Sequence, residues 1–235
     1  MDTQTRHALK GDKFAEATKT GVSWVSGHRE GVVRWVVSVG TAVLVVAAAW
    51  IFWNVRTSAA DAALGAALDV YSAPLAIPGA PPQKGVYATA KERAQAANQQ
   101  FAAVAQQYGW LPQGARAHYF AGVTDADLGQ NGQAETELKA AANAWDRNLA
   151  NLAKLALAGL YHQTGRDNDA ITLYNDLTAK PSTTVPATVA QLDLADLYAA
   201  TGKKEQARAL WAKVKDADKD GMAGSIATQK LASVQ

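Results

Sequence analysis

The nine residues LAGLYHQTG at positions 157–165 return as LADLYAATG at positions 194–202, so every matched residue lies 37 positions after its counterpart. The match extends to an alanine and an aromatic residue further along each copy, which are Ala170 with Tyr174 and Ala207 with Trp211. Weaker copies lie upstream, formed by Ala121-Gly122, Gly129, Ala134 and Leu138 at a spacing of 36, and by Ala97 and Phe101 before them. Repetition at this period predicts a stack of similar units.

Each copy has the composition of two helices joined by a tight turn. Alanine and leucine are good helix formers, and the glycine of each copy suits the end of a helix. Small residues allow the paired helices to approach closely, and they are Gly122, Ala134, Ala158, Ala170, Ala195 and Ala207. Aromatic residues fill the space between successive pairs, and they are Tyr161, Tyr174, Tyr198 and Trp211. Because a single pair cannot bury its apolar face, the sequence predicts an all-α fold in which the stack is the folding unit.

The order of these residues resembles the tetratricopeptide repeat family, whose first helix has a large apolar residue, a small residue and a tyrosine. Residues 157–174 and 194–211 have the whole pattern, whereas the copy around Gly129 has Asp125 at the tyrosine position. The resemblance implies a solenoid of helical hairpins whose first helices line a concave, partner-binding surface. Carried over by position, the candidate binding residues are Arg116, Tyr119, Val123, Leu152, Leu155, His162, Val189, Leu192 and Asp196.

This candidate surface is mostly apolar, and it lacks the lysine and asparagine set with which related chaperone adaptors clamp a C-terminal carboxylate. The sequence leaves two kinds of occupant for this surface. A hydrophobic peptide or an unfolded segment of another protein binds there, or the chain fills the groove with its own residues 57–72 or 223–233. We favour self-filling, because a large bare apolar groove is unfavourable in water.

Residues 35–55 form an uncharged, apolar segment of 21 residues between Arg34 and Arg56. As a helix this segment is about 31 Å long, which matches the hydrocarbon thickness of a bilayer. Tryptophans at positions 35, 50 and 53 suit the two membrane interfaces. A buried core helix and a cleaved signal peptide are the alternatives. The length of the segment and the 34 residues before it favour a transmembrane signal anchor.

The charges around this segment predict its orientation. Six basic residues precede it, whereas Arg56 is the only basic residue after it until Lys84. The positive-inside rule therefore predicts a cytoplasmic N-terminus and, in a bacterium, a periplasmic C-terminal part held by one helix in the inner membrane. Four of the seven prolines lie between Pro74 and Pro82 and predict a hinge. The expected parts are a cytoplasmic tail (1–30), the transmembrane helix (31–56), a membrane-proximal helix with the hinge (57–86) and a periplasmic repeat domain (87–235).

The residue inventory argues against an enzyme, a metal site and nucleic-acid binding. Without cysteine the sequence has no disulfide, no thiolate zinc site and no cysteine nucleophile. Its four histidines lack the spacing of metal ligands, and it has no nucleophile-elbow or phosphate-binding motif. From position 56 onward 17 basic residues balance 17 acidic ones, which disfavours binding to phosphates. We expect no catalytic residue, no cofactor, no metal and no small-molecule substrate, and we expect proteins as partners.

The segment from Asp216 to Gly221 imitates the first half of a calcium-binding loop. The twelfth position of such a loop requires a bidentate glutamate, but Ala227 stands there. A polar turn that caps the last helix is therefore the favoured interpretation.

The order of tail, membrane helix, hinge and repeats is similar to that of the ancillary subunits of the bacterial Sec translocon. That resemblance implies a single-pass protein whose periplasmic repeats contact secreted proteins or their chaperones. The alternative is a structural adaptor for envelope complexes, in outer-membrane assembly, division or cytochrome maturation.

Overall fold

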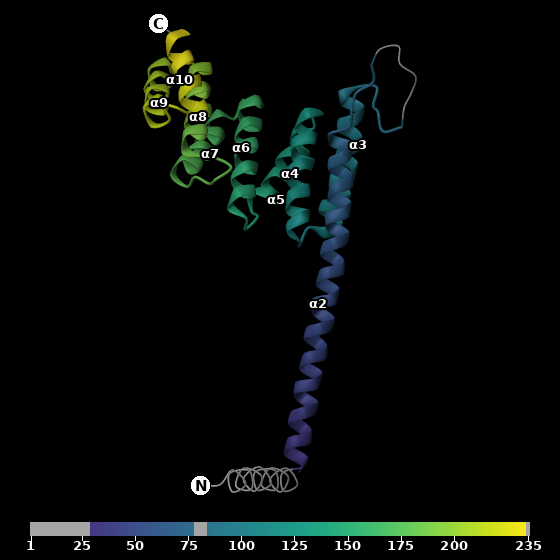
Figure 1. Cartoon of the computed structure of the whole chain (residues 1–235). Coiled ribbons are helices and arrows are strands. Elements are labelled where there is room, and N and C mark those ends of the chain that lie inside the picture. Colours follow the sequence, from purple (N-terminus) through teal and green to yellow (C-terminus); the bar gives the residue numbers. More distant parts are fainter. Residues whose placement is uncertain (1–28, 78–83, 234–235) are drawn as a thin grey trace, which may run out of the picture. The chain divides into compact units, whose positions relative to one another are not determined.

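A computed structural model describes residues 29–77 and 84–233. Within these ranges the chain is helical and has no strand, apart from an isolated bridge between Leu75 and Tyr87. The helices, labelled in Figure 1, are α2 (Arg29–Tyr71), α3 (Ala90–Tyr108), α4 (Pro112–Asp127), α5 (Asn131–Ala142), α6 (Arg147–Gln163), α7 (Asp167–Ala179), α8 (Ala187–Ala200), α9 (Lys204–Ala217) and α10 (Met222–Ser233). The predicted all-α fold is confirmed. The expected tail lies outside the described residues except for its last two positions, as do residues 78–83 of the hinge.

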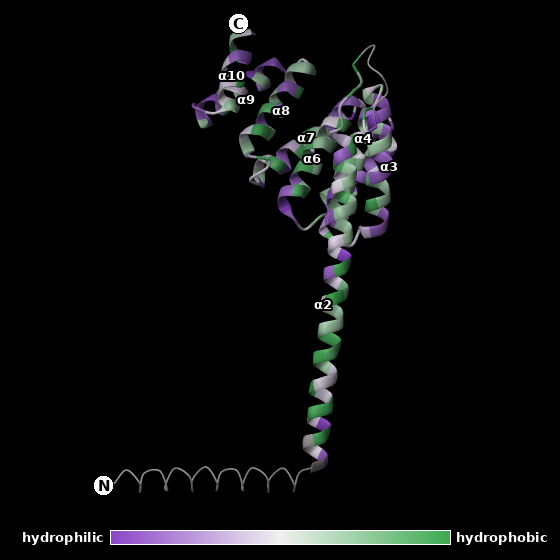
Figure 2. Cartoon of the chain, turned by 45° about the vertical axis from the view of Figure 1, so that its right-hand side comes forward, coloured by the Kyte–Doolittle hydropathy of each residue, from purple (hydrophilic) through white to green (hydrophobic). Residues whose placement is uncertain are grey.

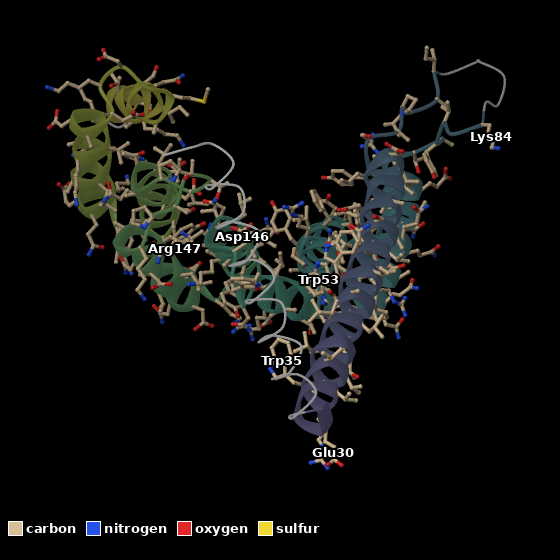
Figure 3. All side chains as sticks on the ribbon, turned by 60° about the horizontal axis from the view of Figure 1, so that its bottom comes forward. Glu30, Trp35, Trp53, Lys84, Asp146 and Arg147 are labelled. Carbon is tan, nitrogen blue, oxygen red and sulfur yellow. The ribbon has the colours of Figure 1, made fainter. Side chains whose placement is uncertain are left out.

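The first compact unit of the chain, residues 1–56, contains the apolar part of α2. Hydrophobic residues follow one another along this part of the helix (Figure 2), and Trp35 projects from it (Figure 3). Within the described residues it belongs to the one helix that is long and apolar enough to cross a membrane, and none of its most apolar window is buried. This part of α2 is therefore not a core helix of the folded chain.

The second compact unit, residues 57–235, begins with the last turns of α2. Three side chains of this segment are buried against α3, and they are Ala60, Leu64 and Ala67. The ring of Tyr71 packs edge-on against Phe101 of α3, with 6.1 Å between the ring centroids. Residues 57–71 therefore form the first helix of a hairpin whose second helix is α3. This hairpin completes the half copy that the sequence shows at Ala97.

The pairing of α2 with α3 differs from the expected domain boundary. The sequence suggests that residues 57–86 lie between the membrane helix and the repeats, but the helical part of this segment is built into the repeat unit. The reason is its apolar face, which packs on α3 and α4. The remainder connects α2 to α3, and one backbone bond and one side-chain bond hold its ends together. The Ala76 amide donates to the Tyr87 carbonyl at 2.8 Å, and the Arg93 guanidinium donates to the Ala73 carbonyl at 2.9 Å.

Three further hairpins follow within the described residues, α4 with α5, α6 with α7 and α8 with α9 (Figure 1). Each of them turns at a glycine with a positive φ angle, which is 76° at Gly129, 76° at Gly165 and 79° at Gly202. This left-handed conformation is open to glycine and costly for a residue with a Cβ atom. The amide that follows each glycine donates back to the first helix, as the Arg166 amide does to the Tyr161 carbonyl at 2.7 Å. The predicted turn glycines are confirmed.

The tyrosines on the first helices of the repeats bind a cation as well as filling space. Two cations that follow a turn glycine lie over these rings, Arg166 over Tyr161 at 4.0 Å and Lys203 over Tyr198 at 5.4 Å. Such contacts stabilise the turn against the helix that precedes it. In the hairpin of α4 and α5 the tyrosine is replaced by Asp125, which is buried and accepts a hydrogen bond from Asn98 of α3 at 2.8 Å. A polar contact with the preceding helix thus replaces the aromatic one.

Small residues form the interior of the stack. The fully buried alanines include Ala134, Ala158, Ala170, Ala195 and Ala207. Gly122 lies so close to α5 that a Cβ atom there would be 2.6 Å from the Leu138 Cγ atom. At the C-terminal end α10 packs Ala223 and Ala227 into a cluster with Trp211 of α9. The predicted use of small residues for close helix packing is confirmed.

We expect Gly122→Ala to lower the free energy of unfolding by about 1–3 kcal/mol, because the added methyl overlaps Leu138 and forces α4 and α5 apart. Gly159→Ala is the matched control, since no atom lies within 4 Å of its Cβ position in α6. The control should be neutral or stabilising by up to about 1 kcal/mol, through helix propensity. Urea unfolding of the full-length protein in detergent, followed by circular dichroism, measures both. Equal losses in the two variants would contradict this account of the α4–α5 contact.

Candidate functional site

The nine candidate binding residues lie on the first helices of three successive hairpins, three on each of α4, α6 and α8. We call them the first-helix row, which consists of Arg116, Tyr119, Val123, Leu152, Leu155, His162, Val189, Leu192 and Asp196. Arg116 is exposed and Leu192 is buried, and the other seven are partly exposed. The structure thus brings most of the row to the surface of the repeat unit.

The part of the row on α4 and α6 is apolar and accessible. Tyr119, Val123, Leu152 and Leu155 each pack on the largest core cluster of the described residues and keep part of their surface exposed. Burial raises the pKa of Tyr119, and the neighbouring Tyr71 of α2 raises it further. Side chains that are held in place by a core on one side are pre-organised for contact on the other, which suits a binding surface.

Two residues of the row on α8, Leu192 and Asp196, contact the C-terminal helix. Leu192 is 9% exposed and packs in the cluster formed by α8, α9 and α10. The Asp196 carboxylate accepts hydrogen bonds from the Trp211 indole at 3.0 Å and from the Lys230 ammonium of α10 at 2.9 Å. Of the two segments considered for self-filling, residues 223–233 therefore occupy part of the row. Residues 57–71 pair with α3 instead.

Asp193 of α8 is a feature of this face that the sequence pattern did not reveal. It follows Val189 by four residues and therefore lies on the same side of the helix. Burial raises the pKa of Asp193 to about 6, and the charge of Asp196 adds to the shift. Among the residues that the structure describes, none donates a hydrogen bond to this carboxylate. A partner group that is cationic or donates a hydrogen bond would offset the cost of burying this charge.

The two histidines in the described part of the chain each contact a carboxylate on the neighbouring helix. The His118 Nδ1 atom lies at 2.5 Å from Glu137 of α5, and the His162 Nδ1 atom lies at 2.7 Å from Asp167 of α7. These pairs join the two helices of a hairpin, so they are not visible as a motif within one helix. Within residues 29–77 and 84–233 no group of three or more histidine, aspartate and glutamate side chains is placed to hold a metal ion.

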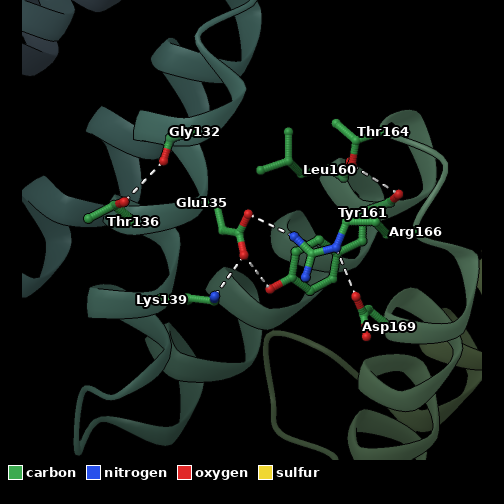
Figure 4. Close-up of polar contacts among 9 residues, drawn as sticks. All are labelled: Gly132, Glu135, Thr136, Lys139, Leu160, Tyr161, Thr164, Arg166 and Asp169. Carbon is green, nitrogen blue, oxygen red and sulfur yellow. Dashed lines mark hydrogen bonds and ion pairs between the residues drawn. The ribbon is translucent and has the colours of Figure 1, made fainter.

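Glu135 of α5 is the centre of a polar cluster that joins two hairpins (Figure 4). Its carboxylate accepts hydrogen bonds from Lys139 at 2.6 Å, from the Tyr161 hydroxyl at 3.0 Å and from Arg166 at 2.8 Å. Arg166 also donates to Asp169 of α7 at 2.8 Å. Hydrogen bonds from Lys139 and Arg166 lower the pKa of Glu135 to about 2. The cluster thus ties α5 to α6 and to the turn after it, and it positions the α6 part of the first-helix row against the preceding hairpin.

The segment that imitates a calcium loop includes the last two residues of α9 and the connection to α10. The Asp218 carboxylate accepts a hydrogen bond from the Gly224 amide at 3.1 Å, in the first turn of α10. An acidic side chain in this place satisfies a free backbone amide and opposes the positive end of the helix. The segment is therefore the polar, helix-capping turn that the sequence predicts.

The hairpins, the turn glycines and the first-helix row all follow a tetratricopeptide plan, and comparison with known families agrees. A family model described as a tetratricopeptide repeat-like domain matches residues 31–235. The chain belongs to this family. Comparison with curated proteins gives no significant match. Tetratricopeptide repeat-like domains act as scaffolds for protein interactions, and the match includes all of the helical part of α2 that pairs with α3.

Glu135→Gln tests the cluster that joins the hairpins. We expect a loss of stability on the order of 1 kcal/mol at neutral pH, because one charged acceptor serves three donors. The pKa of Glu135 is lowered from 4.5 to about 2 in the folded protein, so its stabilising effect is present above the higher value and is lost as the pH falls towards the lower one. Urea unfolding of the wild type and the variant should therefore differ at neutral pH and converge in strong acid.

Glu205→Gln is the control for this prediction. Glu205 pairs with Arg208 on α9, but its side chain is 88% exposed. Solvent screens such a pair, and we expect no measurable change in stability at either pH. A loss as large as that of Glu135→Gln would mean that charge neutralisation alone, and not the cluster, accounts for the effect.

Proposed function

We propose that this protein is a membrane-anchored scaffold that binds other proteins at the periplasmic face of a bacterial inner membrane. The apolar part of α2 supports the anchor, because its exposed surface suits hydrocarbon better than water. The basic residues before α2 support a cytoplasmic N-terminus. The family supports the role in protein interaction.

The accessible apolar part of the first-helix row is the observation that carries the proposal. It lies on two successive first helices and consists of Tyr119, Val123, Leu152 and Leu155. Partly exposed apolar side chains grouped in this way are typical of a surface that binds another protein. Asp193 adds a partly buried carboxylate on the next first helix. The partner segment that fits this face has apolar side chains followed by a cationic or hydrogen-bond-donating group.

The anchor affects binding by this face because it keeps the face close to the membrane. A scaffold held by one helix stays close to the membrane and has a high effective concentration for any chain that emerges there. A binding surface with only a few accessible apolar side chains therefore works without high affinity. Release remains fast, which suits transient contact with chains in transit.

The partners that fit this arrangement are the Sec translocon, secreted proteins or their chaperones. A chain that leaves the membrane before folding exposes apolar segments, and these are the groups that the first-helix row would contact. The similarity of layout to translocon ancillary subunits supports the same partners. An adaptor for envelope complex assembly is the alternative, and it differs in binding a fixed set of folded proteins.

Photocrosslinking in cells separates these partners. A photoreactive amino acid at Tyr119, Leu155 or His162 should capture translocon subunits or newly secreted chains, because all three positions are accessible on the row. Leu155→Glu should abolish capture from Tyr119 without unfolding the protein. Capture restricted to a constant set of envelope proteins would reject the translocon proposal and support the adaptor.

Leu173→Glu is the matched control for Leu155→Glu. Leu173 is also a partly buried leucine on the largest core cluster, but it lies on α7, the second helix of its hairpin. The two variants should lose similar stability in urea unfolding, and only Leu155→Glu should lose partner capture. Equal loss of capture would mean that both act through folding.

The orientation of the chain is tested separately. Because the protein has no cysteine, Thr3→Cys and Ser233→Cys each introduce the only thiol. A membrane-impermeant maleimide applied to spheroplasts should label position 233 and leave position 3 unlabelled until the membrane is permeabilised. The reverse pattern would place the repeats in the cytoplasm and overturn the periplasmic proposal.

A further inference from the structure

Trp145 is the most exposed large apolar side chain in the described residues, at 95%. It lies in the connection between α5 and α6 and lines a cavity of about 430 Å³. The apolar lining of this cavity also includes Pro112 and Ala115 of α4 and Leu149 of α6. We call it the α4–α6 cavity, because these two first helices form it together with the connection that leads into α6.

The α4–α6 cavity continues the first-helix row towards the starts of the helices. Arg116 belongs to both, since it is a residue of the row and lines the cavity. On α6, Leu149 precedes Leu152 of the row by three residues, and on α4, Ala115 precedes Tyr119 by four. Residues at these spacings lie on the same side of a helix. A segment that binds along the row on α4 and α6 therefore has the cavity next to it.

The charges of the cavity complement an anionic group. Arg116 and Arg147 are exposed, and neither guanidinium is in an ion pair within residues 29–77 and 84–233. Asp146, which lies beside Arg147 at the start of α6 (Figure 3), accepts a hydrogen bond from the Asn148 amide at 2.9 Å and caps the helix. The start of α4 has no side-chain cap and adds a partial positive charge.

The combination of two guanidinium groups with an apolar lining selects the kind of anion. Guanidinium groups bind carboxylates through paired hydrogen bonds, and tryptophan and arginine are enriched at the residues that dominate protein interfaces. The cavity volume of about 430 Å³ lies within the range of about 300–1,000 Å³ that is usual for small binding sites. A bare phosphate would leave the apolar lining and the Trp145 ring uncovered, whereas an acidic peptide with apolar side chains covers both.

We infer that the α4–α6 cavity binds an acidic segment of a partner protein, with a carboxylate at Arg116 and Arg147 and an apolar side chain against Leu149 and Trp145. The inference rests on the proposed function, because this segment continues the one that lies on the first-helix row. It adds a chemical requirement to that partner, which is an aspartate or glutamate beside apolar residues at the α4–α6 end of the row.

Peptide binding to the full-length protein in detergent tests this inference. The probe is a short fluorescein-labelled peptide of alternating leucine and aspartate with blocked ends, and the reference peptide has asparagine in place of aspartate. Fluorescence anisotropy at low salt should show about tenfold tighter binding of the aspartate peptide, because two exposed guanidinium–carboxylate pairs each contribute modestly. Arg116→Gln with Arg147→Gln should reduce the affinity for the aspartate peptide to that for the asparagine peptide.

Lys213→Gln with Lys215→Gln is the matched control, since it removes the same charge from two exposed positions of α9. This variant should keep the preference for aspartate, and an equal loss in it would mean that the overall charge, and not the cavity, attracts the peptide. A preference that persists in the arginine variant would overturn the assignment to the cavity. Displacement of the aspartate peptide by inorganic phosphate at constant ionic strength would show a simple anion site and reject the peptide.

Two further measurements complete the test. Trp145→Ala should weaken the binding of both peptides, because it removes an apolar contact that does not depend on charge, and unchanged binding would contradict the role of the indole. Photocrosslinking from Tyr119 separates this inference from the proposed function. Capture from Tyr119 in cells, together with equal affinities for the two peptides, would overturn the acidic-segment site and leave the scaffold standing. A preference for aspartate without any capture would support the site and overturn the role proposed for the row.

Discussion

Close approach of helices is the constraint on which the rest of this structure depends. The helices of each hairpin meet at alanine or glycine, and at Gly122 the space that remains is smaller than a methyl group. A glycine or alanine on one helix leaves room for a larger side chain of the other, as Gly122 does for Leu138, and further tyrosines and leucines pack in clusters that include residues of successive hairpins. Each hairpin therefore depends on the hairpins or helices next to it for its stability.

This dependence explains the two ends of the stack. At the N-terminal end the last turns of α2 pair with α3, and at the C-terminal end α10 covers α8 and α9. The two ends differ in what they leave open. The α2 segment serves as a further first helix, whereas α10 contacts Leu192 and Asp196 of the first-helix row. The candidate binding face is thus a consequence of how the ends are closed.

A residue can be predicted from the sequence where it acts through its own backbone or its own size. The turn glycines and the buried alanines could be predicted for this reason, because φ and volume are local properties. A residue that acts through a distant partner is harder to predict from the sequence. Asp125 stands where a tyrosine was expected, and its role became clear only with Asn98, which lies 27 positions earlier. The Glu135 cluster likewise depends on Tyr161 and Arg166 of the next hairpin.

By itself the sequence determined the helical repeat, the position of its turns and the apolar segment of α2, since period, glycine placement and hydropathy are written along the chain. The tertiary structure decided which surface stays open and which polar groups are satisfied. Asp196 is bound to Lys230 because α10 packs at α8. Asp193 lacks a donor because none of the helices that meet α8, which are α7, α9 and α10, provides one. The physical reason is that burial and hydrogen bonding depend on which helices pack together, and residues far apart in the chain make those contacts.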